Sequence, residues 1–257
     1  SPADLFITVD VGKLWQAGDM DLLQKIKDET ITAGIDSEFL DPNNYWIPLT
    51  YRSRVVVYSK ERVDVNDLST YEDLANEKWK NRLLIRSSSN SYNQALMSSL
   101  IANLGSDVAE DWSTKIVSNL AREPKGNDRD QVKAIASGQG DIAVVNSYYI
   151  GLLLSSEKEE ELKAGYSVGV FFPNQAENQR GAHINVSGIA LTKNAPNREN
   201  AIKLISFLTS KSAQQTYVNN TYEYSVNSSV EPNEIVKSWG DFKKDKLDLN
   251  MLGVKRN

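Results

Sequence analysis

The sequence has no cysteine and only one histidine, His183, among its 257 residues. The lack of cysteine excludes thiolate metal sites and thiol nucleophiles, and one histidine is too few for a His-rich zinc site. No apolar run approaches the roughly eighteen residues that a membrane span needs. The 29 Lys and Arg are outnumbered by 34 Asp and Glu and are scattered. We therefore expect neither a membrane span nor a nucleic-acid partner.

The apolar residues follow an alternation of strands and helices. Residues 83–86 and 142–145 read as short buried strands, and each is followed by a helical pattern. The helix before the second strand closes at Gly138. Strands alternating with helices are typical of an α/β fold, here with mixed, mostly parallel sheets.

The length allows two domains, and no low-complexity linker separates them. The chain would then cross between two α/β lobes on ordered strands, near residues 49–54 and 183–188, with a cleft between the lobes. The lobes expected from the sequence are residues 1–50 plus 184–226 and residues 51–183 plus 227–257. The opening "SPADLFITVDVG" reads as a strand already in progress, so we expect further residues of the first lobe before Ser1.

Two tyrosine positions lie where such folds bind ligands. In open α/β sheets ligands sit beyond the carboxyl ends of strands, where helices begin. Tyr92 in "SSSNSYNQ" would be the first helical residue after Ser91 as N-cap, and Tyr148 and Tyr149 in "VVNSYYIG" would open a helix capped by Asn146 or Ser147. The positive end of a helix dipole lowers the cost of a phenolate there.

Phenolates near neutral pH need a strong cationic partner, because free tyrosine ionises near pKa 10. Hard oxygen donors without sulfur point to ferric iron more than to zinc or copper, and three phenolates would balance Fe3+. Arg52 or Arg54 could offset a fourth. The alternative is structural: chance alone gives about half an adjacent tyrosine pair in a chain with this composition, and buried tyrosines with bonded hydroxyls are common.

Other candidates are weaker. His183 lies in an expected strand and is more simply a hydrogen-bonded structural residue. The acidic run "SSEKEEEL" fits a solvated helix face, and "SGQGD" lacks the phosphate-binding loop pattern. No serine–histidine or paired-carboxylate arrangement stands out, so a hydrolase or transferase is the least favoured reading.

Four stretches of the chain, taken in order, match a known protein family. They are "YWIPLTYRSRVVVYSKE", "NRLLIRSSSNSYNQ", "GQGDIAVVNSYYIG" and "GAHINVSGIALTKNAPNRENAIKLISFL". In these stretches it resembles the ferric-iron substrate-binding proteins of bacterial ABC transporters, and most of all the cyanobacterial FutA type. The resemblance implies a two-lobed type II periplasmic binding protein, not an enzyme. Such a protein would act as a monomer in the periplasm, close on Fe3+ and deliver it to the inner-membrane permease subunits.

The resemblance also implies the site. The family's paired tyrosine ligands fall on Tyr148 and Tyr149, the additional tyrosine on Tyr92, and a charge-balancing arginine on Arg52. Relatives begin about fifty residues earlier, and that stretch supplies a further His or Tyr ligand, with a signal peptide ahead.

Two alternatives stay open at this point. Where some relatives have a glutamate ligand this chain has Val9, which favours an all-tyrosine site without a required anion. The bound ion is expected as Fe3+, with Fe2+ as the alternative oxidation state. The same fold could instead bind a small organic solute or anion, with the tyrosines as walls of the site.

Overall fold

The computed structural model describes residues 3–256, which form two compact units. Unit 1 holds the chain up to Arg52, Asn185–Asn233 and the chain from Leu247 on, and unit 2 holds Ser53–Ile184 and Glu234–Lys246. The chain passes between the units inside strands β3 (Trp46–Ser59) and β7 (Ile184–Thr192). It crosses twice more, between Asn233 and Glu234 and between Lys246 and Leu247.

The end of the chain departs from the expected lobes, because residues 227–233 and the segment from Leu247 on belong to unit 1. Helix α11 (Met251–Val254) packs against α1 (Val11–Asp19) of that unit. The approach is so close that a Cβ at Gly253 would lie 2.6 Å from the Trp15 ring. Arg256 also donates from Nη1 to Asp10 Oδ2 at 2.8 Å. The charged tail gives no sign of these contacts in sequence.

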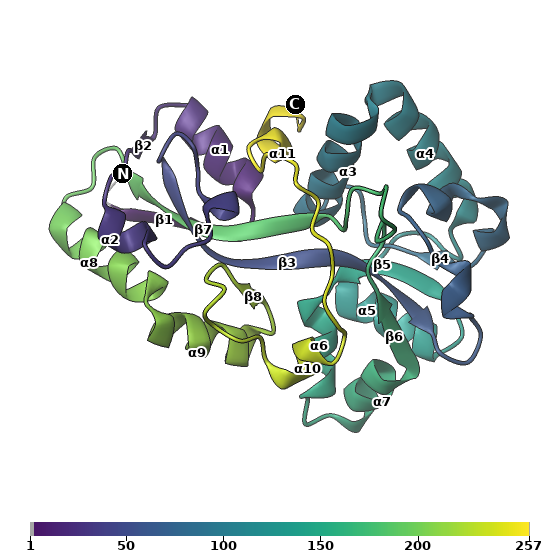
Figure 1. The fold of residues 1–257 in the computed structure, drawn as a ribbon. Coiled ribbons are helices and arrows are strands. Elements are labelled where there is room, and N and C mark those ends of the chain that lie inside the picture. Colours follow the sequence, from purple (N-terminus) through teal and green to yellow (C-terminus); the bar gives the residue numbers. More distant parts are fainter. Residues whose placement is uncertain (1–2, 257) are drawn as a thin grey trace. The chain divides into compact units, whose positions relative to one another are not determined.

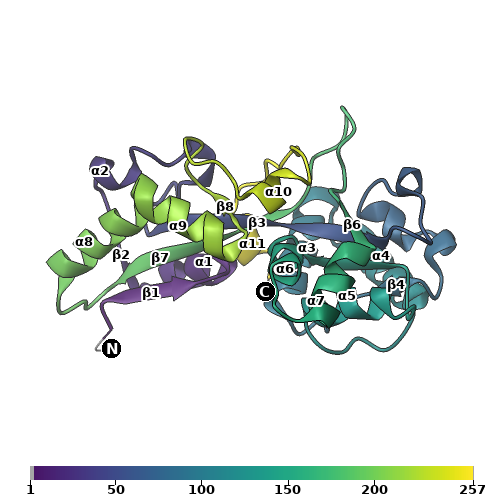
Figure 2. The same cartoon turned by 90° about the horizontal axis from the view of Figure 1, so that it is seen from below.

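Unit 1 is built on antiparallel pairs. Strands β1 (Leu5–Thr8) and β2 (Leu23–Gln24) pair with β7, and β8 (Tyr224–Ser225) pairs with the first half of β3. Helices α1 and α11 lie on one side of these strands and α8 and α9 on the other (Figure 1), and α8 and α9 follow one another along the strands (Figure 2). Helix α8 spans Arg198–Thr209 and α9 spans Lys211–Thr221. Unit 1 also contains α2 (Glu29–Thr32) and the 3₁₀ turn η1 (Ser37–Phe39).

Unit 2 has a mixed sheet. The second half of β3 pairs antiparallel with β5 (Ile142–Asn146) and with β6 (Val168–Phe171), whereas β4 (Leu83–Leu84) pairs parallel with β5. The helices of this unit are α3 (Ser91–Leu104), α4 (Ser106–Asn119), α5 (Asp128–Ala136), α6 (Tyr148–Leu154), α7 (Glu159–Ser167) and α10 (Glu234–Lys237), with 3₁₀ turns η2 (Val65–Asp67), η3 (Glu72–Ala75) and η4 (Glu77–Trp79).

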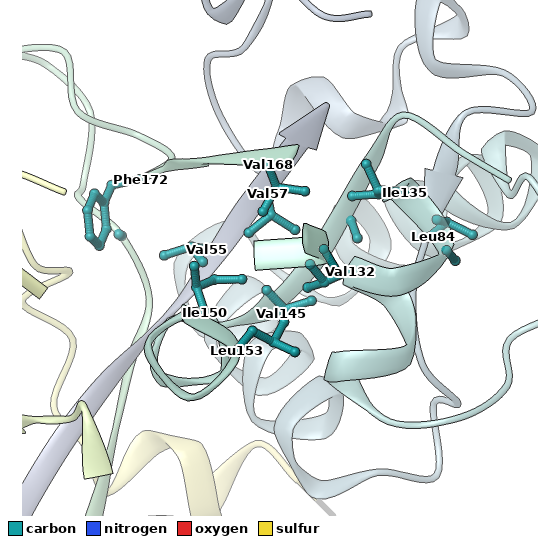
Figure 3. Packing of buried hydrophobic residues seen from close by; sticks show 14 residues of the cluster. Val55, Val57, Leu84, Val132, Ile135, Val145, Ile150, Leu153, Val168 and Phe172 are labelled. Carbon is teal, nitrogen blue, oxygen red and sulfur yellow. The ribbon is translucent and has the colours of Figure 1, made fainter. Parts of the chain in front are cut away.

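Both faces of the unit 2 sheet are covered, which explains its unbroken apolar strands. Side chains alternate between the faces of a strand, so Val55 and Val57 enter one core and Val56 the other. Figure 3 shows the first core, where Val55, Val57 and Val145 pack against residues of α5 and α6. The second core lies under α3 and α4. Unit 2 therefore has a hydrophobic core on each face of its sheet.

The expected mixed sheets are present, but the balance of directions differs from expectation. The pairs that β3 forms with β5, β6 and β8 are antiparallel, and only the pairing of β4 with β5 among the registers given above is parallel. The reason is that one long strand, β3, serves both units and runs opposite to its partners. Across residues 3–256, none of the helices has the length and apolar character needed to cross a membrane.

Candidate metal centre

The three candidate tyrosines all lie in unit 2, at the start of two helices. Tyr148 and Tyr149 are the first residues of α6, directly after β5 and Ser147. Tyr92 is the second residue of α3. Because β4 and β5 run parallel, with Leu83 beside Ile142, the chain leaves both strands at the same edge of the sheet. Their order in the sheet therefore brings tyrosines 56 positions apart in the chain to one place.

The caps of these helices differ from those expected. Asn90, not Ser91, caps α3, and its Oδ1 accepts from the Tyr92 amide at 3.0 Å. Ser147 makes no side-chain capping bond to α6 and already has helical dihedral angles. Tyr92 is thus fixed by its own backbone hydrogen bond to the cap, while Tyr148 and Tyr149 are placed by the strand that precedes them.

The three phenols form one cluster. The hydroxyl oxygens of Tyr92 and Tyr148 are 3.3 Å apart. The rings of Tyr148 and Tyr149 pack with centroids 4.3 Å apart and planes inclined by 31°. The sequence expectation that these three residues share a site is consistent with this arrangement, and their role as metal ligands remains a proposal.

Burial governs the acidity of the paired tyrosines. It raises the pKa of Tyr148 well above that of a free phenol, and the proximity of the Tyr92 phenol adds to the rise. Burial likewise raises the pKa of Tyr149, and its hydrogen bond with Tyr148 offsets only part of that rise. The helix dipole invoked from the sequence is therefore outweighed by desolvation. Both phenols are neutral at pH 7 unless a cation replaces their protons.

A buried charged network lies behind the phenols. Asp128, the first residue of α5, is fully buried and accepts from Arg54 Nη1 at 2.5 Å. The same Oδ2 atom accepts from the Asn146 amide at 2.8 Å. Arg54, only 1% exposed, also donates to the side-chain oxygen of Asn146 at 3.2 Å. The network thus joins β3, α5 and the end of β5, two residues before Tyr148.

Two arginines of this network flank the Tyr92 ring. The Arg54 and Arg86 guanidinium carbons lie 5.9 and 5.4 Å from its centroid, which is cation–π range. Arg86 Nη1 approaches Asp128 Oδ1 at 3.4 Å. Asn93, the neighbour of Tyr92, accepts from Arg54 Nη2 at 2.6 Å and donates to the Arg86 carbonyl at 2.8 Å. The two arginines and one aspartate carry a net charge of +1 beside the phenols.

Arg52 lies in unit 1 and is 1% exposed. Its guanidinium donates to the Val9 carbonyl oxygen and, from Nη1, to Ser187 Oγ at 3.2 Å. Ser187 Oγ in turn lies 3.5 Å from a carboxylate oxygen of the buried Glu223. Arg52 therefore contacts the backbone of Val9, which stands where the family resemblance implies a glutamate ligand in some relatives.

His183 is buried within unit 2, at 4% exposure. Its backbone carbonyl accepts from the Arg54 amide at 3.0 Å and from Ser53 Oγ at 3.0 Å. Over residues 3–256, no three His, Asp or Glu side chains are grouped so that they could hold a metal ion. The backbone of His183 thus helps to fix the middle of β3 against the segment that leads into β7.

Reasoning from the sequence missed Asp128 and Arg86, and it considered Asn146 only as a possible helix cap. The stretch "KGNDRDQ" does contain a pattern that indicates a helix start. It forms a capping box, in which Asn127 Oδ1 accepts from the Asp130 amide and Asp130 Oδ2 accepts from the Asn127 amide. That pattern marks the start of α5 and so places Asp128 at its first position. The ion pair to Arg54, 74 residues away, has no local signal.

Comparisons with known proteins agree on one group. The model of the family described as "Bacterial extracellular solute-binding protein" matches residues 1–244. Iron uptake protein A1 of Synechocystis is 45% identical over 253 residues, which are 98% of this chain and 70% of that protein. The structure of the Trichodesmium protein IdiA (FutA) in complex with iron and citrate has a TM-score of 0.94 at 44% identity, covering 100% of this chain and 80% of that one. Apo FutA2 from Synechocystis has a TM-score of 0.94 at 39% identity, covering 100% and 81%.

Proposed function

The chain belongs to the bacterial extracellular solute-binding proteins, and we propose that it is the ferric-iron-binding component of an ABC importer. Its similarity to an iron uptake protein and to an iron-bound structure supports this assignment. The cargo is Fe3+, held through the phenolates of Tyr92, Tyr148 and Tyr149. Proteins of this family carry solutes, so the chain acts as a transport component and not as an enzyme.

The distance between the Tyr92 and Tyr148 oxygens carries the proposal. Bonds from hard metal ions to oxygen are roughly 2 Å long, so two oxygens on one ion lie about 2.8 to 3.3 Å apart for angles of 90° to 109°. The observed 3.3 Å falls within this range. Tyr149, whose ring packs at a tilt against that of Tyr148, supplies the third phenol of the cluster. One ion can therefore be bound by both oxygens with little movement of either side chain.

Charge favours a trivalent ion at this site. Three phenolates carry −3, which Fe3+ neutralises by itself, whereas a divalent ion would need the net positive charge of the Arg54, Arg86 and Asp128 network as well. Burial raises the pKa of Tyr148 and Tyr149, so a cation has to polarise the phenols strongly to replace both protons at pH 7. The phenols are therefore selective for a strongly polarising ion.

We propose Arg52 as a charge-balancing neighbour of the bound ion. Its guanidinium is already desolvated and held by Val9 and Ser187, so it would add positive charge without ordering a mobile side chain. Any further ligand comes from another residue, from water or from an anion. The protein would act as a monomer in the periplasm and deliver iron to inner-membrane permease subunits.

Iron loading tests the proposal directly. Tyrosinate bound to Fe3+ gives a red to purple charge-transfer band, which neutral tyrosine lacks. Addition of ferric nitrilotriacetate to the wild-type protein should produce this band, and the double variant Tyr148→Phe, Tyr149→Phe should abolish it. The matched control is Tyr166→Phe, because Tyr166 is in unit 2 but is 65% exposed.

Two results would contradict the assignment. One is a colourless protein after iron loading, and the other is a band that survives loss of both paired phenols. Titration calorimetry with small organic acids and inorganic anions, run beside iron, distinguishes an importer of organic solutes or anions. Saturable heat from such a solute and none from iron would favour that reading of the same fold.

A further inference from the structure

We propose that Asp128 is a positioning residue that holds the three tyrosines in one arrangement before the metal arrives, an inference that rests on the proposed function. It reaches Tyr148 and Tyr149 through the Asn146 amide and Tyr92 through Arg54 and Arg86. Asp128 itself touches none of the phenols in the contacts given above, so it acts through its neighbours.

The hydrogen bond to Asn146 fixes the strand end that carries the tyrosine pair. Asn146 is the last residue of β5 and lies opposite Arg54 in β3. Its amide donates to Asp128 Oδ2 at 2.8 Å, while the next amide, of Ser147, donates to the Ser53 carbonyl at 2.9 Å. A helix start, α5, is thus tied to the strand end directly before Tyr148. A carboxylate that accepts a buried amide here restricts where α6 begins.

The ion pairs fix the side that carries Tyr92. Asp128 is 0% exposed and Arg54 is 1% exposed, so removing one partner leaves the other as an uncompensated buried charge. Arg54 Nη2 reaches Asn93 Oδ1, and Asn93 Nδ2 returns to the Arg86 carbonyl. Because Asn93 follows Tyr92 in α3, this loop of contacts sets the rotation of the first helical turn. Both guanidinium groups also lie within cation–π distance of the Tyr92 ring.

These contacts share one aspartate, which makes its effect testable apart from its neighbours. Without Asp128, Arg54 and Arg86 would repel each other beside the Tyr92 ring, and the Asn146 amide would lose its acceptor. Tyr92 on α3 and the tyrosine pair on α6 would then both become less fixed in position. A role confined to anchoring α5 would instead affect that helix alone.

The variant that tests the proposal is Asp128→Asn, which keeps the size of the side chain, removes its charge and leaves one oxygen, now uncharged, to accept from both Arg54 and the Asn146 amide. The control is Asp130→Asn in the same first turn of α5, which removes a charge at the same helix end but only breaks the capping contact with Asn127. Hydrogen exchange by mass spectrometry on the iron-free proteins should show at least about tenfold faster exchange around Asn146 in the first variant only. Faster exchange in neither variant, or equally in both, would overturn the proposal.

Iron binding supplies the second readout. The Kd for Fe3+ should weaken at least about tenfold in Asp128→Asn relative to Asp130→Asn, and the charge-transfer band should shift or broaden. Equal affinity and an identical band in the two variants would overturn the proposal. Failure of the wild-type protein to bind iron would instead refute the proposed function, while the exchange measurement would still decide whether Asp128 holds the strand end.

A second pair of variants covers the case in which Asp128→Asn does not fold. The side chain of Arg86 is 16% exposed, so its substitution disturbs the core less than that of Asp128. Arg86→Gln removes one of the two guanidinium groups beside the Tyr92 ring. The control is Arg82→Gln, whose partner is Asp141. Arg86→Gln should raise the exchange rate in the first turn of α3 and weaken iron binding about tenfold relative to Arg82→Gln. No difference between them would reject the proposal.

Discussion

At the scale of single residues, the phenol cluster is governed by burial. Desolvation raises the pKa of Tyr148 and Tyr149, so a phenolate exists there only when a metal ion takes the place of the proton. Under the proposed function, the site would therefore exchange protons for iron. It also means that the affinity for iron depends on pH through the tyrosines themselves.

Acidification should release the iron. Each phenolate that takes up a proton weakens binding by up to about tenfold per pH unit below its effective pKa in the complex, and several phenolates act together, so release is steep. The loss of the charge-transfer band between pH 7 and about pH 4 measures it. The Tyr92→Phe variant, with fewer protons to exchange, should show a shallower transition. Full retention of the band well below this range would count against tyrosinate ligation.

Tyr71 should contribute to the stability of unit 2 through its hydroxyl group. The residue is fully buried, its hydroxyl donates to the Arg54 carbonyl, and it accepts from the His183 amide at 3.1 Å. Tyr71→Phe leaves both backbone groups without this partner, and we expect a loss of about 1 to 3 kcal/mol. Urea unfolding measures it, with Tyr166→Phe as the exposed control. A loss no larger than that of the control would mean that the two backbone groups find other partners.

At the scale of elements, the sequence was informative where structure is local. The unbroken apolar run Ile142–Val145 predicted a short buried strand, and the residues that follow it predicted a helix opening on Tyr148. Residues that form a strand and a helix start are close in the chain, so their pattern carries the information. The position of each tyrosine at a helix start was predictable for the same reason.

Long-range pairings were not predictable in this way. The ion pair of Arg54 with Asp128 depends on how β3 and α5 pack, and neither residue lies in a pattern that names the other. The antiparallel direction of β3 likewise follows from its passage through both units, since alternation of strands and helices alone suggests parallel neighbours. The docking of α11 on α1 rests on single contacts such as that of Gly253 with Trp15.

The close approach of Gly181 to the backbone of Lys243 and Lys244 should require glycine at this position. Gly181 has a φ of +100°, and a Cβ there would lie 2.6 Å from backbone atoms of Lys243 and Lys244. Gly181→Ala combines left-handed strain of about 1 to 2 kcal/mol with a clash that only backbone movement relieves. Gly138→Ala, with a φ of +75° and open space around it, carries the strain alone. Urea unfolding should therefore rank Gly181→Ala as clearly more destabilising, and equal costs would show that the segment moves freely.

At the scale of the whole molecule, buried tyrosines in both units should set the alkaline limit of stability. Burial raises the pKa of Tyr51 in unit 1 and of Tyr71 in unit 2 well above that of a free phenol. A group whose pKa is raised by folding keeps its proton in the native state while the unfolded chain loses it. Its contribution is complete below the unfolded pKa of about 10 and is lost as the pH rises above it.

Each such tyrosine should remove about 1.4 kcal/mol of unfolding free energy per pH unit above pH 10. Urea unfolding between pH 8 and about pH 11.5, with phenolate absorbance recorded on the native protein, checks this. The wild type should lose stability more steeply than Tyr71→Phe, because that variant has one fewer proton to surrender on unfolding, whereas Tyr166→Phe should follow the wild type. Parallel curves for the wild type and Tyr71→Phe would mean that Tyr71 ionises in the native state, which its complete burial beside the Arg54 carbonyl argues against.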